Sequence, residues 1–144
     1  MGSESMANIP PIYPDIFTMP PYEENPPELL GGHCPSCKQH YFPKPTFCPK
    51  CLGPVEQAKL GSEGTIYTYT VIRTKAPMGL PEPYGVGYID LKVSELRIFC
   101  LLDPGAVDDL SVGMPVRLRV GPIGKDVNGN PCLRPYFTPL KTPV

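Results

Sequence analysis

The chain has 144 residues, of which 41% are hydrophobic, and a net charge of −1, which suits one domain of ordinary size or two small units that share a core. No apolar run approaches the roughly 20 residues that span a bilayer, and the acidic, proline-rich N-terminal stretch lacks the basic and apolar regions of a secretory signal. We therefore expect a cytoplasmic protein without a membrane partner, and the near-neutral charge excludes a dedicated duplex-DNA binder.

Residues 1–30 are predicted to form an extended, proline-rich, acidic arm. They contain five acidic side chains and no Lys or Arg, and twelve of the 22 prolines precede residue 55. Because proline lacks a backbone N–H and fixes φ, this front third cannot build long helices or central strands. The arm contains several large apolar groups, namely Ile9, Ile12, Tyr13, Ile16, Phe17, Met19 and Tyr22. Disordered tails are usually poor in such groups, so we expect the arm to pack on a partner or on its own domain.

Residues 31–60 are predicted to form a zinc ribbon. Four of the six cysteines fall in two C-x2-C knuckles separated by ten residues, and they are Cys34, Cys37, Cys48 and Cys51. Each knuckle curls two thiolates around one point, and two knuckles complete the tetrahedron that Zn²⁺ accepts from soft ligands. Four thiolates leave no open position for water, so we expect a structural metal whose removal unfolds this lobe.

Iron is the alternative metal, since rubredoxin also uses two C-x2-C knuckles, although with a much wider separation. His33 and His40 flank the first knuckle, but four cysteines already saturate the ion, so we expect the imidazoles to face solvent or to support the ligands. The segment from Gln39 to Phe42 should form a short strand between the knuckles. Cys100 and Cys132 are remote from the cluster, and Cys100 lies in an apolar run typical of a core.

Residues 61–144 are predicted to form an OB-fold-like β-barrel. Period-two alternation and β-branched or aromatic residues indicate strands at 65–74, 84–91, 95–102, 116–120 and 132–138. Asn128-Gly129 lies between the last two and is a strong hairpin signal. Five strands in about 75 residues, without a convincing helix, favour a small closed barrel over an open sheet. The expected fold class is therefore mainly β, with an arm, a four-cysteine ribbon and a C-terminal barrel.

The remaining residues do not suggest a catalytic set. Both histidines lie beside the metal ligands, and the sequence shows no Ser-His-Asp, Cys-His or paired-carboxylate arrangement. We therefore expect no active site in this chain. Several cations could bind an anionic ligand near the ribbon–barrel junction, and they are Lys44, Lys50, Arg73, Lys75, Arg117, Arg119 and Arg134. Four tyrosines could stack on bases, although strand aromatics are more often core, and they are Tyr67, Tyr69, Tyr84 and Tyr88.

An ordered set of motifs gives the chain a resemblance to a known family. The set runs Cys34-x2-Cys37, Tyr41-Phe-Pro-Lys-Pro45, Cys48-Pro-Lys-Cys51, Gly64-Thr-Ile-Tyr-Thr-Tyr-Thr-Val71, Pro83-Tyr-Gly-Val-Gly-Tyr-Ile89, Gly113-Met-Pro-Val-Arg117 and Pro135-Tyr-Phe-Thr-Pro139. Over residues 30–140 the chain resembles the DUF35 family of acyl-CoA-associated proteins, in which a rubredoxin-like zinc ribbon is fused to an OB-fold. The family usually begins with a helix that contains a Phe-Trp pair, whereas this chain has the arm, which suggests a different partner surface.

The resemblance implies a non-catalytic accessory subunit. Family members bind thiolases, thiolase-like acyltransferases or MaoC-type hydratases, where they help hold coenzyme A or shape the acyl channel. We therefore expect structural Zn²⁺, coenzyme A or acyl-CoA shared with a partner, and a thiolase-like catalytic subunit in a hetero-oligomer, with a heterotetramer as the expected form. Lys44, Arg73 and Lys75 are the candidates for coenzyme A phosphate contacts. A single-stranded nucleic-acid-binding module, which the mild acidity disfavours, and a scaffold that binds only protein are the alternatives.

Overall fold

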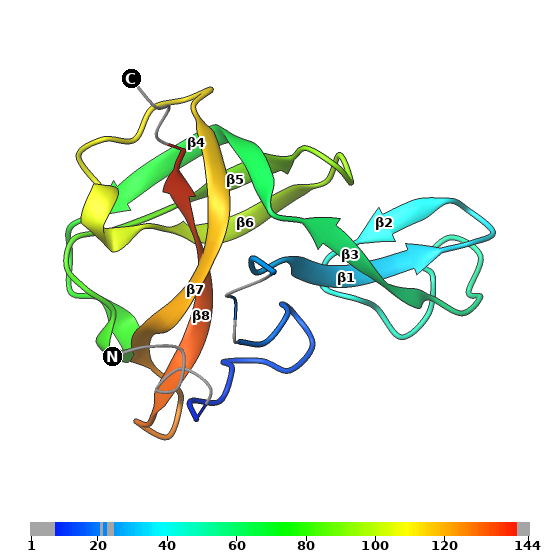
Figure 1. Cartoon of the computed structure of the whole chain (residues 1–144), viewed down its shortest axis with the longest axis horizontal. Helices are drawn as coiled ribbons and strands as arrows, with labels where there is room; N and C mark the ends of the chain where they lie inside the picture. The colour runs from blue at the N-terminus through cyan, green and yellow to red at the C-terminus, as the bar shows by residue number, and fades with distance from the viewer. Residues whose placement is uncertain (1–7, 21, 23–24, 141–144) are drawn as a thin grey trace.

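The computed structural model describes residues 8–20, 22 and 25–140, and these form a mainly β protein, which confirms the expected class (Figure 1). Three strands form a small sheet, and they are β1 (Leu29–Cys34), β2 (Gln39–Tyr41) and β3 (Glu56–Gly61). Five strands form a barrel, and they are β4 (Glu63–Ile72), β5 (Tyr84–Leu91), β6 (Arg97–Leu102), β7 (Pro115–Lys125) and β8 (Pro131–Pro139). The helices in this part of the chain are two short 3-10 turns, η1 (Pro77–Gly79) and η2 (Pro104–Ala106), and neither has the length or the apolar character that crossing a membrane requires.

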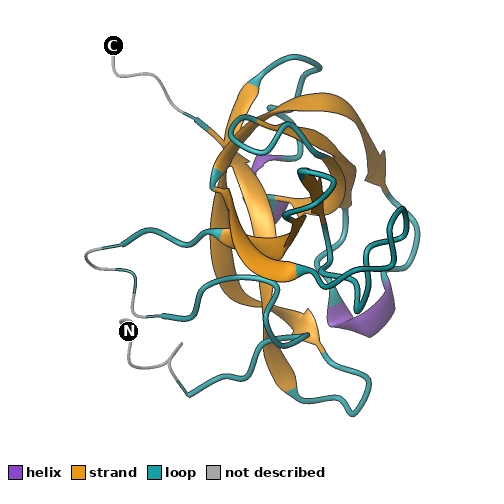
Figure 2. Cartoon of the chain, turned by 90° about the vertical axis from the view of Figure 1, so that its right-hand side faces the viewer, coloured by secondary structure: helices purple, strands orange, loops and turns teal. Residues whose placement is uncertain are grey.

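The barrel closes in the strand order β4-β5-β6-β8-β7, and the expected OB-like barrel is confirmed. Figure 2 shows these strands curving around a common centre. Neighbouring strands are antiparallel except for β6 and β8, which run parallel where Leu101 lies opposite Tyr136. The N-terminal part of β4 pairs with both β5 and β7, and its later residues pair with β5 alone. β4 therefore runs from the ribbon across the barrel.

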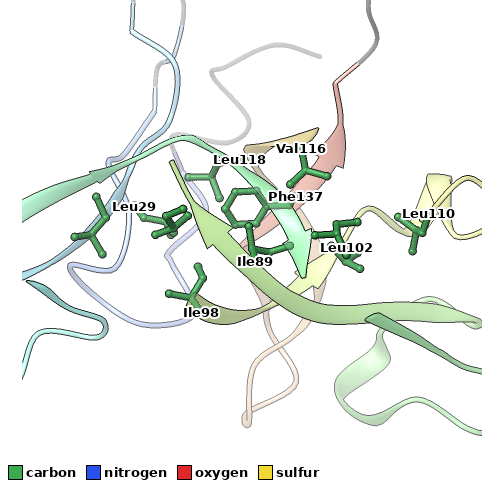
Figure 3. Packing of buried hydrophobic residues seen from close by; sticks show 11 residues of the cluster. Leu29, Ile89, Ile98, Leu102, Leu110, Val116, Leu118 and Phe137 are labelled. Carbon is green, nitrogen blue, oxygen red and sulfur yellow. The ribbon is translucent and has the colours of Figure 1, made fainter. Parts of the chain in front are cut away.

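Inward-facing strand positions supply all but one of the eleven buried residues of the barrel core, and Leu110 comes from the segment before β7 (Figure 3). On β7, Val116 and Leu118 are buried while Arg117 and Arg119 are exposed. The predicted period-two alternation is therefore confirmed for this strand, which has an apolar inner face and a cationic outer face. Phe137 of β8 is fully buried in the same cluster. Burial of these side chains is the main force that holds the barrel closed.

The ribbon joins the barrel through this shared core. Leu29 of β1 and Leu60 of β3 are fully buried in the barrel cluster, and Figure 3 shows Leu29 at one end of it. Neither strand is predicted from the sequence, because neither segment is rich in β-branched residues. A Cβ at Gly31 would collide with the carbonyl oxygen of Tyr41 and lie 2.5 Å from Leu60 Cδ1. Glycine therefore permits the close approach of β1 to its neighbours.

The described part of the arm lies against the barrel. The N–H of Ile12 donates to the carbonyl of Leu133, and the N–H of Leu133 donates to the carbonyl of Pro10, each at 2.8 Å. Phe17 is only 2% exposed and packs in a small cluster with Leu133. These contacts extend the sheet beyond β8 by a short parallel pairing. Some positions of the predicted arm and barrel lie outside the described residues, and they are 1–7, 21, 23–24 and 141–144.

Candidate metal centre and ligand-binding groove

The four knuckle cysteines come together beyond the C-terminal end of β1. Their sulfur atoms all lie within 4.8 Å of one another. The Sγ–Sγ distance is 3.5 Å between Cys34 and Cys51 and 3.8 Å between Cys37 and Cys48. Four Zn–S bonds of about 2.3 Å in a tetrahedron place the sulfur atoms about 3.8 Å apart. The donor set and its dimensions therefore fit one tetrahedral ion.

The two knuckles share one backbone conformation. The N–H of Lys38 donates to the carbonyl of Cys34 at 2.7 Å, and the N–H of Leu52 donates to the carbonyl of Cys48 at 2.8 Å. Lys38 and Leu52 both take a positive φ, 56° and 62° respectively. Backbone N–H groups also point at sulfur atoms within each knuckle. Such donors stabilise thiolates and so favour the form that binds a metal.

Tyr41 of β2 supports the cluster from one side. Its hydroxyl lies 3.4 Å from Cys48 Sγ. The hydrogen bond from Tyr41, together with knuckle N–H groups, lowers the pKa of the Cys48 thiol from 9.0 to about 6, and the same contact raises the pKa of Tyr41 to about 12. A hydrogen bond with Cys51 is the largest cause that raises the pKa of Cys37 to about 12. Cys48 is therefore the cysteine of the cluster best prepared to be a thiolate near neutral pH.

An apolar groove of about 370 Å³ lies where the arm, the ribbon and the barrel meet. Its lining comes from segments far apart in the sequence and includes Tyr13, Phe42, Phe99, Leu101, Val127 and Pro135. Phe42 follows β2 and carries the ribbon side of the groove, whereas Phe99 and Leu101 belong to β6. The volume and the apolar lining are those of a small-molecule or side-chain binding site. We call it the junction groove, because it lies at the ribbon–barrel junction.

Arg134 is the cation in the lining of this groove. Its guanidinium donates to the carbonyl oxygens of Ile123 at 2.6 Å and Lys125 at 3.1 Å. It also lies 3.2 Å from Cys132 Sγ and 3.3 Å from Met78 Sδ. These contacts join η1, β7 and β8 into one wall. Most of the donors of Arg134 are therefore engaged within the barrel, and its main effect is to fix the shape of the groove.

The three predicted coenzyme A residues lie apart. Lys44 is exposed in the ribbon after β2, whereas Arg73 and Lys75 are exposed after the C-terminal end of β4. β4 begins beside the ribbon and ends on the far side of the barrel (Figure 1). Its ten residues can span up to about 33 Å. None of the three lines the junction groove. The structure thus separates Arg73 and Lys75 from the ribbon–barrel junction, where the sequence analysis placed them.

A larger cavity of about 740 Å³ is lined by the first residues of β4, β6 and β7, the last residues of β5 and the turn between β5 and β6. Its lining contains the carboxylates of Glu63, Asp90 and Glu95 against the cations Lys92 and Arg97. Arg97 is already paired with Asp90, with an Nε–Oδ1 distance of 2.6 Å. The surplus of negative charge disfavours a polyanion such as coenzyme A in this cavity.

Aromatic side chains cover the outer surface of the first three barrel strands. Tyr67 on β4, Tyr88 on β5 and Phe99 on β6 are each about half exposed. The rings of Tyr88 and Phe99 lie 5.2 Å apart, centre to centre. The Arg97 guanidinium stacks 3.4 Å above the centre of the Tyr67 ring. Phe99 also lines the junction groove, so the aromatic surface is continuous with the groove.

The four tyrosines noted in the sequence divide between surface and interior. Tyr67 and Tyr88 lie on the outer surface, whereas Tyr84 is buried and Tyr69 donates its hydroxyl to the carbonyl of Leu110 at 2.9 Å. Sequence reasoning missed Phe99, which precedes Cys100 in the apolar run typical of a core. Ile98 beside it is buried, so alternation from Ile98 is the signal that identifies Phe99 as outward-facing.

Comparison with known proteins covers both lobes. Residues 25–56 match the rubredoxin-like zinc ribbon domain of ChsH2, and residues 57–121 match the C-terminal OB-fold domain of ChsH2. Among solved structures, the Ltp2-ChsH2(DUF35) aldolase is similar, with a TM-score of 0.62 and 26% identity. That similarity covers 78% of this chain and 84% of the other.

One curated relative extends the match to the arm. The benzoylsuccinyl-CoA thiolase subunit BbsA of Thauera aromatica is 33% identical over 135 residues, which are 93% of this chain and 91% of the relative. A DUF35 domain-containing scaffold protein of Methanocaldococcus jannaschii is 34% identical over 92 residues, which are 61% of this chain and 64% of the relative. With its four-cysteine ribbon, its five-stranded barrel and these relatives, the chain belongs to the DUF35 family.

Proposed function

We propose that this chain is a non-catalytic accessory subunit of a thiolase-type complex, that is, of an acyl-CoA C-acyltransferase. The observation that carries the proposal is the similarity to a benzoylsuccinyl-CoA thiolase subunit over 93% of this chain and 91% of that subunit. The similarity therefore includes the arm as well as the ribbon and the barrel. The aldolase in which ChsH2(DUF35) occurs together with Ltp2 supports a role within an assembly.

The reactive groups are assigned to the catalytic partner. Cys132 of this chain is only 1% exposed and cannot meet a substrate. Burial raises the pKa of the Cys100 thiol to about 12, the reverse of what a nucleophilic cysteine needs. The knuckle cysteines face one another, and we assign them structural Zn²⁺. In that role the ion organises the ribbon and supplies no reaction step.

The partner is proposed to dock on the junction groove and the aromatic surface beside it. Tyr13, Phe99 and Val127 line the groove and are at least 58% exposed. Contiguous exposed apolar side chains of this kind mark interaction sites, and aromatic residues are enriched in protein interfaces. The heterotetramer that we propose would hold two copies of each chain, because closed two-fold assemblies are the commonest oligomers.

The docking proposal is tested by coexpression of this chain with a thiolase-type catalytic subunit. We expect the two chains to copurify as a hetero-oligomer. Phe99→Ser and Val127→Ser should weaken the complex, whereas Val112→Ser, an equally exposed change away from the groove, should leave it intact. If the unchanged chains do not associate, the accessory role fails. If they associate and the groove variants behave like Val112→Ser, the role stands and the docking site lies elsewhere.

Coenzyme A is proposed to be shared between this chain and the partner. Lys44 offers one exposed cation on the ribbon, and Arg73 with Lys75 offers a second basic position after β4. Such cations bind phosphate through charge-assisted hydrogen bonds. Calorimetry of coenzyme A binding to the complex decides between these two basic positions. The position at which substitution to Ala weakens binding severalfold is the one that contacts the phosphates. Unchanged affinity in Lys44→Ala and in the Arg73→Ala, Lys75→Ala double variant would remove this chain from the phosphate site.

A second candidate function rests on the aromatic surface of β4, β5 and β6. OB-folds bind single strands on this part of the barrel, where bases stack on aromatic rings. Tyr67, Tyr88 and Phe99 provide such rings, but Arg97 beside them is neutralised by Asp90. A single-stranded oligonucleotide should therefore bind weakly or not at all. Tight binding with a steep salt dependence would support the nucleic-acid function instead.

A further inference from the structure

The two histidines of the chain form a pair across two ribbon strands. His33 on β1 lies directly opposite His40 on β2, and Glu56 on β3 lies opposite His33 on its other side. Residues directly opposite in an antiparallel sheet project from the same face. Cys34 follows His33 in β1, so its side chain leaves from the other face. The ribbon therefore carries two imidazoles and a carboxylate in one row, on the face turned away from the thiolates.

The imidazole spacing suits a shared metal ion. The ring centres of His33 and His40 lie 4.8 Å apart, with an angle of 45° between the ring planes. A metal–nitrogen bond of about 2.0–2.1 Å places the ion about 3.2 Å from the centre of each ring. Two imidazoles bound at about 90–109° then have centres about 4.5–5.2 Å apart. The observed separation falls within this interval.

The donor atoms of the pair are accessible. Both imidazoles are half-buried rather than enclosed. The side-chain hydrogen bonds among described ribbon residues run between the cysteines and Tyr41 or backbone groups, and none of these engages an imidazole. Glu56 is exposed and lies opposite His33 in the strand register. At least one nitrogen of each ring is thus free to bind.

We propose that His33 and His40 chelate a second ion, a divalent first-row transition metal such as Ni²⁺, Cu²⁺ or Zn²⁺, with Glu56 as a third ligand and water in the remaining positions. Imidazole and carboxylate donors suit these ions, whereas the soft thiolates of the knuckles select the structural ion. The proposal is independent of the accessory-subunit function. The ion would tie β2, the three-residue edge strand of the ribbon, to β1 beside the first knuckle.

The test is a calorimetric titration of the zinc-loaded, full-length chain, without a histidine tag, with Ni²⁺. We expect one Ni²⁺ per chain with all of the zinc retained, as measured by elemental analysis. Because loss of either imidazole breaks the two-histidine chelate, His33→Gln and His40→Gln should each weaken Ni²⁺ binding by about 100-fold. Glu56→Gln should weaken it less, and Glu95→Gln, an exposed carboxylate on the barrel, should have no effect.

The zinc content of each variant reports whether the ribbon still folds. If His33→Gln loses zinc, His40→Gln is the variant that tests nickel binding, because His40 lies on the edge strand. Nickel affinity that does not change in His40→Gln would overturn the proposal, and so would nickel uptake that occurs only as zinc is lost. A readout that a structural role would not move is the loss of nickel-induced thermal stabilisation in His40→Gln, since an ion that binds only the folded ribbon raises its unfolding temperature.

Discussion

The hydroxyl of Tyr41 lies 3.4 Å from the sulfur of Cys48 and so connects the edge strand β2 to the second knuckle. This contact crosses the ribbon, because Tyr41 precedes the turn between the knuckles and Cys48 follows it. Of the contacts that lower the pKa of Cys48, this hydrogen bond has the largest effect. The ribbon fold and the metal site are therefore coupled through one hydrogen bond.

Tyr41→Phe should make the ribbon release its metal at a higher pH. The lowered pKa of Cys48 contributes stability that is complete above pH 9.0 and is lost as the pH falls toward about 6. Without the hydroxyl, the pKa of Cys48 rises and protons displace the ion more easily. A zinc-indicator titration against pH checks this, with Tyr13→Phe, an exposed tyrosine, as the control. Equal release midpoints for Tyr41→Phe and the control would contradict the coupling.

Removal of the metal should unfold the ribbon and leave the barrel folded. The thiolates lose the ion that offsets their mutual repulsion, and this lobe has little apolar core of its own apart from the cysteines and Val55. In Cys48→Ser or in chelator, hydrogen exchange should speed up at the amides of β1 and β2, whereas those of β5 and β8 stay protected. Cys100→Ala should keep its zinc. Persistent protection of the ribbon without metal would count against a structural ion.

Gly31→Ala should destabilise the protein by about 1–3 kcal/mol. Its Cβ would collide with the carbonyl oxygen of Tyr41 and with Leu60, which is part of the shared core. Gly105→Ala is the matched control, since the nearest neighbour of its Cβ lies 3.4 Å away. Urea unfolding measures both variants. Equal midpoints for the two would show that β1 does not need the close approach seen here.

Phe17→Ala should free the arm from the barrel. Truncation of a buried Phe costs about 3–5 kcal/mol, and this loss falls on a small cluster with Val120 and Leu133 rather than on the barrel core. We expect faster proteolytic cleavage in the arm with little change in the unfolding of the barrel. Tyr13→Ala, at an exposed arm position, should be cleaved at the rate of the unchanged chain. Equal cleavage of both variants would mean that Phe17 does not hold the arm.

Local pattern located all five barrel strands, although it ended β7 (Pro115–Lys125) at residue 120. The predicted strand at 84–91 coincides with β5, and the Asn128-Gly129 signal falls in the turn between β7 and β8, where Gly129 has a φ of 81°. In these segments alternation and turn chemistry agree with the tertiary fold. β1 and β3 were not predictable in this way, because their strand conformation comes from pairing with each other and from the pairing of β1 with β2.

The two candidate sites differ in the same way, because local sequence predicts the cysteine cluster but not the junction groove. The cysteine cluster follows from spacing alone, because C-x2-C knuckles bring their sulfurs together locally. The junction groove combines the arm, Phe42, β6 and β8, so no local pattern could reveal it. The separation of Arg73 from Lys44 follows from the path of β4 across the barrel. Nearness in sequence to the ribbon was not a guide to nearness in space.

The accessory role is tested most directly by an assay of acyl-CoA thiolysis with three preparations. These are the purified chain, the thiolase-type partner, and the copurified complex of the two. The account predicts no turnover by the purified chain and full turnover by the complex, with the zinc content of this chain unchanged. Turnover by the single chain that persists through further purification would contradict the account, because it would place the reactive groups in this subunit.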